Sequence, residues 1–343
     1  MFQDFFGNQA VAQTLRALAN QERIPQTILL EGQEGVGKAT LARRFAAALV
    51  GEAGKIEQDD LSLEANAAVI ADREKWPADK RNEDPLFFGT HPDFLTFPPD
   101  GPLRQITIEQ MRLLKQRAQF KPLHGLRRVF LIDHIDRANE QAANSLLKTL
   151  EEPPEHLILV LTAENPYDLL PTIRSRSVSF HLAPLSNAEM RTFSEARGLP
   201  EPQRRVALAD GSPGIAVSMD LDLYDERRIA MLHLLQVSAG RAPFAEWLKH
   251  AEALATRKQE KLEALLKILY VLLEDVLMLA HGVEEIRNAD IRHDLEELTG
   301  RISFDWIRTA VRRADEISGL VRRNIQKNIA LDALVMELRR IAA

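Results

Sequence analysis

Hydrophobic positions in the first half of the chain fall into short, continuous apolar runs that alternate with helical stretches. Continuous runs, unlike alternating ones, are typical of strands buried on both faces, and such strands occur in parallel sheets covered by helices. The runs with the length of strands are residues 27–30, 93–97, 129–132, 156–161 and 178–182. We therefore expect an α/β domain with a five-stranded parallel sheet over residues 1–183.

Strand signals stop at Pro184, where a helical pattern replaces them. Residues 186–219 predict small helices, the first of them capped by Ser186 with Glu189 three residues later. From residue 222 onward, leucines and isoleucines recur at the spacing of one helix face. The expected domains are therefore an α/β domain (1–183), a small helical domain (184–221) and an all-α domain (222–343).

Residues 51–90 follow neither pattern. The segment is polar and acidic at first, and we interpret it as an insertion with one helix. The chain contains no cysteine, which excludes disulfides, thiol nucleophiles and cysteine-ligated zinc. Packing alone is expected to hold the insertion, and no metal-ligand set is predicted.

Composition and charge narrow the function further. The chain has 343 residues, and a single hydrophobic core stops growing at roughly 250–300 residues, so two or three domains are expected. A net charge of −6 argues against a chain that grips DNA by itself, because phosphate contacts need Lys or Arg. The start of the chain lacks a signal-peptide pattern, and the apolar stretch at 262–279 is interrupted by charges, so no membrane span and a cytoplasmic location are expected.

A glycine-rich segment follows the first predicted strand and opens a helix, which is the context of a phosphate-binding P-loop. The glycines let backbone N–H groups turn toward phosphate oxygens, and the helix N-terminus adds its positive end. Lys38 would reach the terminal phosphates. The alternative is a glycine-rich helix entry with a solvated lysine. The predicted nucleotide-binding residues of this segment are Gly32, Gly35, Val36, Gly37, Lys38, Ala39 and Thr40.

The P-loop departs from an active one directly after Lys38. A Ser or Thr is expected there because its hydroxyl ligates magnesium, but the residue is Ala39. Thr40 comes one residue late, which turns it about 100 degrees around the helix. The third predicted strand ends in Asp133, as a Walker B strand that delivers a carboxylate to magnesium does. The alternative for Asp133 is a capping residue at the end of a buried strand.

Several further segments carry a more specific signal. The run Leu-Leu-Lys-Thr-Leu-Glu-Glu-Pro-Pro resembles the helix and turn of bacterial clamp-loader subunits of the AAA+ class, and Thr-Ile-Arg-Ser-Arg-Ser resembles their Ser-Arg-Cys motif. Three shorter segments extend the resemblance, most closely to the delta-prime group, over nearly the whole chain. The first run is residues 146–154 and the second is residues 172–177. The three shorter segments are residues 5–8, 91–94 and 323–328.

This resemblance implies a P-loop AAA+ module, a small helical lid domain and a helical collar that holds a five-membered ring of gamma/tau-type and delta-type subunits. The ring opens the sliding (beta) clamp and places it on primer-template DNA. The chain itself is expected to carry no polymerase active site. In this family the motif arginine acts in trans as a finger on a neighbour's nucleotide, where a planar, always-charged guanidinium suits the charge on a γ-phosphate. By position it is Arg176, with Arg174 as the less favoured alternative.

The same resemblance shows which active-site groups are missing. Active members carry the magnesium hydroxyl, a Glu after the Walker B Asp and a second-domain arginine, where this chain has Ala39, His134 and Ile215. Thr162 remains as a first-sensor polar residue. These losses predict a non-hydrolysing stator whose P-loop binds ATP with Mg²⁺ weakly or without turnover. Delta-prime subunits often have four zinc cysteines after the P-loop helix; none is present, so no zinc is expected.

Alternative readings remain open at this point. The chain could be a catalytic ATPase like the gamma/tau motor, or a stand-alone P-loop phosphotransferase. Arg176 could be an ordinary surface arginine or a structural partner of Glu151 or Glu152. Arg112, Lys115 and Arg117 could face DNA in the ring or form a solvated helix face.

Overall fold

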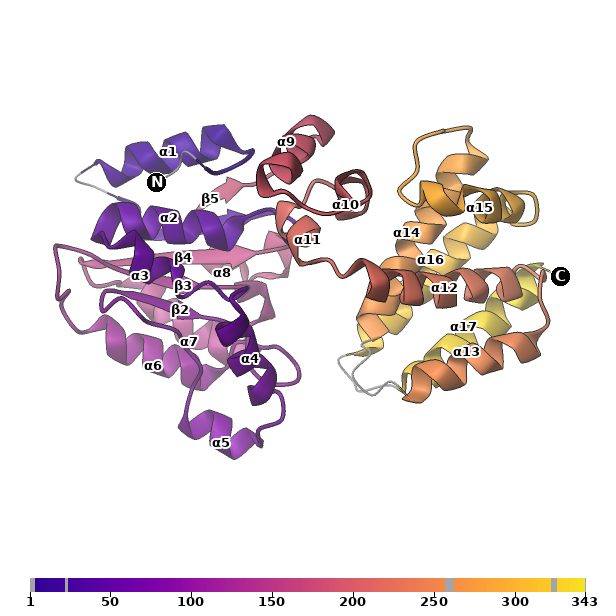
Figure 1. Cartoon of the computed structure of the whole chain (residues 1–343). Coiled ribbons are helices and arrows are strands. Elements are labelled where there is room, and N and C mark those ends of the chain that lie inside the picture. The colour runs from indigo at the N-terminus through magenta and orange to yellow at the C-terminus, as the bar shows by residue number, and fades with distance from the viewer. Residues whose placement is uncertain (1–3, 22–23, 257–261, 322–325, 343) are drawn as a thin grey trace. The chain divides into compact units, whose positions relative to one another are not determined.

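The computed structural model describes residues 4–21, 24–256, 262–321 and 326–342 (Figure 1). The chain divides into two compact units, which we describe separately. The first contains Met1–Pro202 and Ala209–Val217, and the second contains Gln203–Leu208 and Ser218–Ala343. The three-domain division stays a prediction. Residues 323–325 of the C-terminal family segment lie outside the described residues.

The first unit is built on a parallel sheet of five strands in the order β2-β3-β4-β1-β5, which confirms the predicted fold. The four strands on the β2 side are buried or nearly so along their whole length, as their continuous apolar runs predict, whereas β5 forms an exposed edge. The strands are β1 (Thr27–Glu31), β2 (Phe94–Phe97), β3 (Arg128–Ile132), β4 (Leu157–Ala163) and β5 (Val178–His181).

Helices cover both faces of this sheet (Figure 1). The helices α1 (Gln9–Ala19) and α2 (Lys38–Val50) lie on one face, and α6 (Ile108–Ala118) and α7 (Glu140–Glu151) lie on the other. Asn139 caps α7 by accepting the Ala142 N–H. Shorter elements follow the strand ends: η1 (Ile135–Arg137), η2 (Pro166–Asp168) and α8 (Pro171–Arg174).

The insertion at residues 51–90 contains three helices, so the prediction of one helix was wrong. They are α3 (Ala53–Glu57), α4 (Glu64–Arg73) and α5 (Ala78–Glu83). Each is too short to give a clear hydrophobic period. Buried arginines hold the segment in addition to packing: Arg43 pairs with Glu57 and Asp60.

A second buried arginine completes this arrangement. Arg73 donates to both carboxylate oxygens of Asp100, at 3.0 and 2.7 Å. The insertion is therefore held by charge-assisted hydrogen bonds as well as by apolar contacts.

Three short helices follow β5: α9 (Asn187–Arg197), α10 (Pro202–Ala209) and α11 (Pro213–Ser218). The predicted cap is confirmed, since Ser186 and Glu189 form a reciprocal capping box at the start of α9. A tight turn at Gly211 and Ser212 leads into α11.

The second unit is helical, as predicted. Its apolar core is formed by leucines of α14 together with Trp247 and Trp306, which are almost fully buried. Over the described residues, no helix is long and apolar enough to cross a membrane. The elements are α12 (Leu221–Ser238), α13 (Phe244–Thr256), α14 (Leu262–Ala280), η3 (Ala289–Ile291), α15 (Arg292–Thr299), α16 (Phe304–Val321) and α17 (Lys327–Ala342).

Candidate functional site

The glycine-rich loop joins β1 to α2 and folds around the side chain of Lys38. Gly35 and Gly37 have φ angles of 75° and 106°, which few residues other than glycine adopt. The Lys38 ammonium donates to the carbonyl oxygens of Gly32 at 2.6 Å and Gln33 at 2.8 Å. Only 5% of Lys38 is exposed, so the alternative of a solvated lysine is wrong.

The start of α11 lies directly against this loop. The Gly214 N–H donates to the Gly35 carbonyl oxygen at 2.8 Å. Ser212 donates its hydroxyl to the Glu34 carbonyl oxygen at 2.7 Å and accepts from the Gln33 amide at 2.8 Å. A side chain at position 35 would collide with Ile215. The sequence predicts small helices in this region, but it did not reveal their contact with the P-loop.

Asp133 lies at the carboxyl end of β3, where a Walker B carboxylate is expected. Its Oδ1 accepts from the Thr162 hydroxyl at 2.5 Å, and Thr162 Oγ1 accepts from the His134 N–H at 2.8 Å. Thr162 is fully buried in β4. The structure therefore brings the two predicted residues Asp133 and Thr162 together at the same edge of the sheet as the P-loop.

Charges gather around Lys38 in a way that the sequence reading only partly anticipated. Burial lowers the pKa of Lys38 below its usual value, and the carboxylates of Glu164, Asp133, Asp136 and Glu34 oppose that shift. Glu164 was not predicted as a site residue. Its position just past the end of β4, beside the ends of the neighbouring parallel strands, is the signal that could have identified it.

His134 and Asp136 occupy the positions where a catalytic Glu would be sought. His134 has a left-handed φ of 56°, and its Nδ1 lies 3.4 Å from Glu164 Oε1. Burial raises the pKa of Asp136, and the His134 imidazole opposes the shift. Asp136 Oδ2 accepts from the Glu164 N–H at 3.4 Å. The His134 ring therefore lies beside the Glu164 carboxylate.

The donor set fits magnesium poorly. Ala39 offers no hydroxyl, which leaves the Asp133 carboxylate as the oxygen expected from the two nucleotide motifs. Among the residues that the structure describes, no group of three or more His, Asp or Glu side chains is placed to hold a metal ion. Any magnesium at this site would depend on phosphate oxygens and water for most of its ligands.

Arg176 lies on the loop between α8 and β5. Its Nη2 donates to Glu151 Oε1 at 2.8 Å, and its Nη1 donates to the Thr172 carbonyl oxygen at 3.2 Å. The Arg176 side chain is 35% exposed and that of Glu151 is 50% exposed. The arginine therefore has a structural partner, and it also reaches the surface of this unit.

The other candidate cations have different surroundings. The Arg174 guanidinium lies 5.2 Å from the centroid of the exposed Tyr167 ring. Arg112, Lys115 and Arg117 are exposed along α6, where Arg112 lies 3.3 Å from Glu109 and Arg117 lies over the Phe87 ring. Their proposed contact with DNA stays a prediction.

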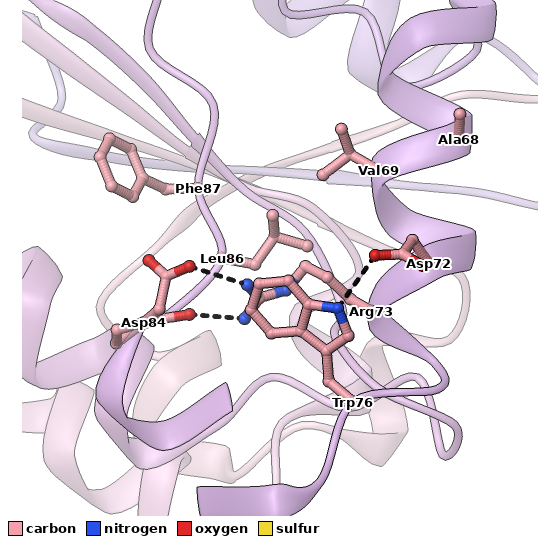
Figure 2. A pocket seen from close by; sticks show the side chains of 9 residues that line it. Ala68, Val69, Asp72, Arg73, Trp76, Asp84, Leu86 and Phe87 are labelled. Carbon is pink, nitrogen blue, oxygen red and sulfur yellow. Dashed lines mark hydrogen bonds and ion pairs between the residues drawn. The ribbon is translucent and has the colours of Figure 1, made fainter. Parts of the chain in front are cut away.

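A cavity of about 520 Å³ is lined by residues of the insertion (Figure 2). Its polar groups are already paired, since Trp76 donates to Asp72 and Arg73 donates to Asp84. All of its lining side chains come from one stretch of the chain, so the cavity is separate from the nucleotide motifs. The lining residues are Ala68, Val69, Asp72, Arg73, Trp76, Asp84, Pro85, Leu86 and Phe87.

Relatives with similar sequences are subunits of DNA polymerase III. The chain is 33% identical over 231 residues to subunit delta' of Pseudomonas aeruginosa, with 64% of each chain covered. It is 29% identical over 218 residues to subunit delta' of Escherichia coli, covering 63% of this chain and 64% of that one. The match thus spans less than two thirds of each of these relatives. Subunit tau of Escherichia coli is 32% identical over 190 residues, covering 55% of this chain and 26% of that one.

A solved structure of a gamma subunit-related protein from Thermotoga maritima aligns with 97% of this chain and 99% of its own, at 18% identity and a TM-score of 0.48. At that score the likeness adds nothing to the fold that the sheet order already establishes. The family model described as DNA polymerase III, delta subunit, matches residues 7–186, which is more than half of the chain. The chain therefore belongs to the DNA polymerase III delta subunit family.

Proposed function

We propose that this chain is a delta-prime-type subunit of a clamp loader, which supports ATP hydrolysis in a neighbouring subunit and does not hydrolyse ATP itself. In this role it joins gamma/tau-type and delta-type subunits in a five-membered ring that loads the sliding clamp onto primer-template DNA in the cytoplasm. Membership of the delta subunit family and the similarity to delta' subunits support this assignment.

The observation that carries the proposal is the contact between α11 and the P-loop. Gly214 and Ser212 bond to the Gly35 and Glu34 carbonyl oxygens, and Ile215 lies beside Gly35 where active family members bring an arginine. An apolar side chain there cannot stabilise negative charge developing on a γ-phosphate. The geometry therefore favours a loop that binds ATP weakly or without turnover.

Two further features support lost hydrolysis. Ala39 removes the hydroxyl that ligates magnesium, and His134 replaces the glutamate that activates water. His134 is shorter than glutamate and its ring lies toward Glu164. ATP is nevertheless a reasonable ligand, because the P-loop is formed and its lysine is in place.

The contribution of this chain to catalysis is proposed to be Arg176. The side chain reaches the surface of its unit, carries a permanent charge and stands in the family's finger motif. Removal of a trans arginine from a phosphoryl-transfer site costs about 10³–10⁵ in kcat, so the expected effect in the ring is large if the arginine is the sole finger for one neighbour.

The test is steady-state ATP hydrolysis by the reconstituted ring with substitutions in this chain alone. Lys38→Ala should leave turnover nearly unchanged, whereas Arg176→Ala should lower it, with both rings assembling normally by size-exclusion chromatography. The isolated chain should not hydrolyse ATP. A strong loss with Lys38→Ala, together with hydrolysis by the isolated chain, would establish an active ATPase of gamma/tau type instead.

A further inference from the structure

We infer that Glu151 is a positioning residue for Arg176 and holds the guanidinium in the orientation from which it meets a neighbour's nucleotide. The inference rests on the proposed function, because it concerns the same arginine. It goes beyond that function by assigning a role to Glu151, which lies on α7, whereas Arg176 lies on the loop between α8 and β5.

The geometry constrains both ends of the guanidinium. Glu151 Oε1 binds Nη2 at 2.8 Å, and the Thr172 carbonyl oxygen binds Nη1 at 3.2 Å. The guanidinium is a rigid planar fork, so contacts at both of its terminal nitrogens restrict the orientations that it can adopt. Arginine otherwise loses considerable rotamer entropy on binding, and ordering it beforehand lowers the entropy cost of reaching the transition state.

The backbone of Glu151 is well placed for this task. Glu151 is the last residue of α7, and its neighbour Leu150 is buried in the core against the sheet. Pro153 and Pro154 follow within three residues and prevent continuation of the helix. The carboxylate therefore extends from a fixed backbone, while half of its side chain remains exposed.

The pair is suited to orienting the arginine and not to sequestering it. The contacts described above use two of the five N–H donors of Arg176. Exposed ion pairs are weak, because water and salt screen them. A γ-phosphate carries more charge than one carboxylate, so it can recruit the remaining donors while the Glu151 contact still sets the direction of approach.

The chain offers a matched control in Glu152, the exposed residue next to Glu151. We would compare the ATPase of the reconstituted ring carrying Glu151→Ala, Glu151→Gln, Glu152→Ala, Arg176→Ala or the Arg176→Ala/Glu151→Ala pair. Glu151→Ala should lower kcat about threefold or more, but less than Arg176→Ala does, and leave KM for ATP unchanged. Glu151→Gln retains an acceptor oxygen and should recover most of kcat, and Glu152→Ala should match the wild type.

The double variant separates positioning from a structural effect. If Glu151 acts through Arg176, the pair should be no slower than Arg176→Ala alone; a structural defect would add to it. An unchanged or raised kcat in Glu151→Ala, or additive losses, would overturn the inference while leaving the finger itself intact. If Arg176→Ala leaves kcat unchanged, the proposed finger fails and the role of Glu151 fails with it.

Discussion

The backbone N–H of Gly214 donates to the carbonyl oxygen of Gly35 at 2.8 Å, which ties the first turn of α11 to the P-loop. The two glycines approach so closely that a Cβ on Gly214 would lie 2.9 Å from the Gly35 oxygen and 3.0 Å from its Cα. This contact joins two segments that are about half the chain apart in sequence and fixes the loop that would hold a phosphate.

Gly214→Ala should therefore destabilise the first unit by about 1–3 kcal/mol, the usual cost of overpacking a tight contact. Gly54→Ala is the matched control, because Gly54 is also helical and a Cβ there meets nothing within 4 Å. That control should be neutral or slightly stabilising, since alanine favours a helix. Urea unfolding followed by circular dichroism compares the two variants. Equal stabilities would mean that α11 and the P-loop can move apart to admit the Cβ without a loss of stability.

Arg73 allows a second test, which asks what holds the insertion in place. Its bond to Asp100 is buried at both ends, with side chains 4% and 2% exposed. Asp100→Ala should cost about 3–5 kcal/mol, because it leaves a buried guanidinium without its main counter-charge. Asp84 also pairs with Arg73, at 3.3 Å, but its side chain is 71% exposed.

Asp84→Ala is accordingly the control and should cost less than about 1 kcal/mol. Thermal unfolding of both variants at the same pH and salt concentration provides the comparison. Similar losses from the two substitutions would show that the insertion does not depend on the buried pair.

The strands of the sheet were predictable because each of them is indicated by residues that are adjacent in the sequence. Each of β1, β3 and β4 is a continuous apolar run, and such a run indicates burial on both faces wherever it lies in the chain. The capping box at Ser186 is equally local, since donor and acceptor are three residues apart. The strand-loop-helix context likewise located Lys38 without a structure.

The parts that could not be predicted depend on long-range partners. The Gln33 amide donates to the Asp210 carbonyl oxygen, 177 residues away, and nothing in either local sequence indicates that pairing. The helices of the insertion form where Arg43 and Arg73 find acidic partners, while their own hydrophobic periods are weak. Sequence reasoning offered Glu151 and Glu152 as alternatives for Arg176, and only coordinates could select Glu151.

Two buried tryptophans of the second unit allow a prediction about hydrogen bonding. Trp247 Nε1 donates to the Asp332 carboxylate at 2.7 Å, and Trp306 Nε1 donates to the Leu338 carbonyl oxygen at 3.0 Å. Replacement by Phe removes the same ring atoms at both positions. Bonds to charged acceptors contribute about 1.5–3 kcal/mol, against about 0.5–1.5 for neutral ones.

Trp247→Phe should therefore lower the free energy of unfolding more than Trp306→Phe does, by about 1 kcal/mol. Guanidinium unfolding of the two variants measures this difference directly. If Trp306→Phe lowers the free energy of unfolding more, the loss of packing around the smaller ring contributes more than the difference between the two hydrogen bonds.

His91 links the stability of the first unit to pH. The side chain is fully buried, and its Nδ1 accepts from the Asp93 N–H at 3.0 Å. Among the described residues its Nε2 has no hydrogen-bond partner. Burial is the main cause that lowers the pKa of His91; the carboxylates of Glu52 and Asp93 oppose the shift, and the charges of Lys55 and His124 add to it.

The lowered pKa of His91 determines how the stability of the first unit changes with pH. In the unfolded chain the pKa of a histidine is about 6.5. Because burial places the folded-state pKa of His91 below that value, the unfolded chain binds more protons than the folded chain as the pH falls. The stability that His91 contributes is present above the unfolded pKa and is lost as the pH falls toward the folded pKa. Urea midpoints measured between pH 8 and pH 5 should therefore decline on the acidic side.

His91→Asn should reduce that decline, because asparagine can accept the Asp93 N–H without titrating. The variant should also be less stable than the wild type at pH 8, where the smaller side chain leaves part of the buried space unfilled. His124→Asn is the control: His124 is exposed and lies 6.2 Å from the His91 ring, so its removal should leave most of the slope intact. Equal slopes in wild type and His91→Asn would assign the acid sensitivity to another group.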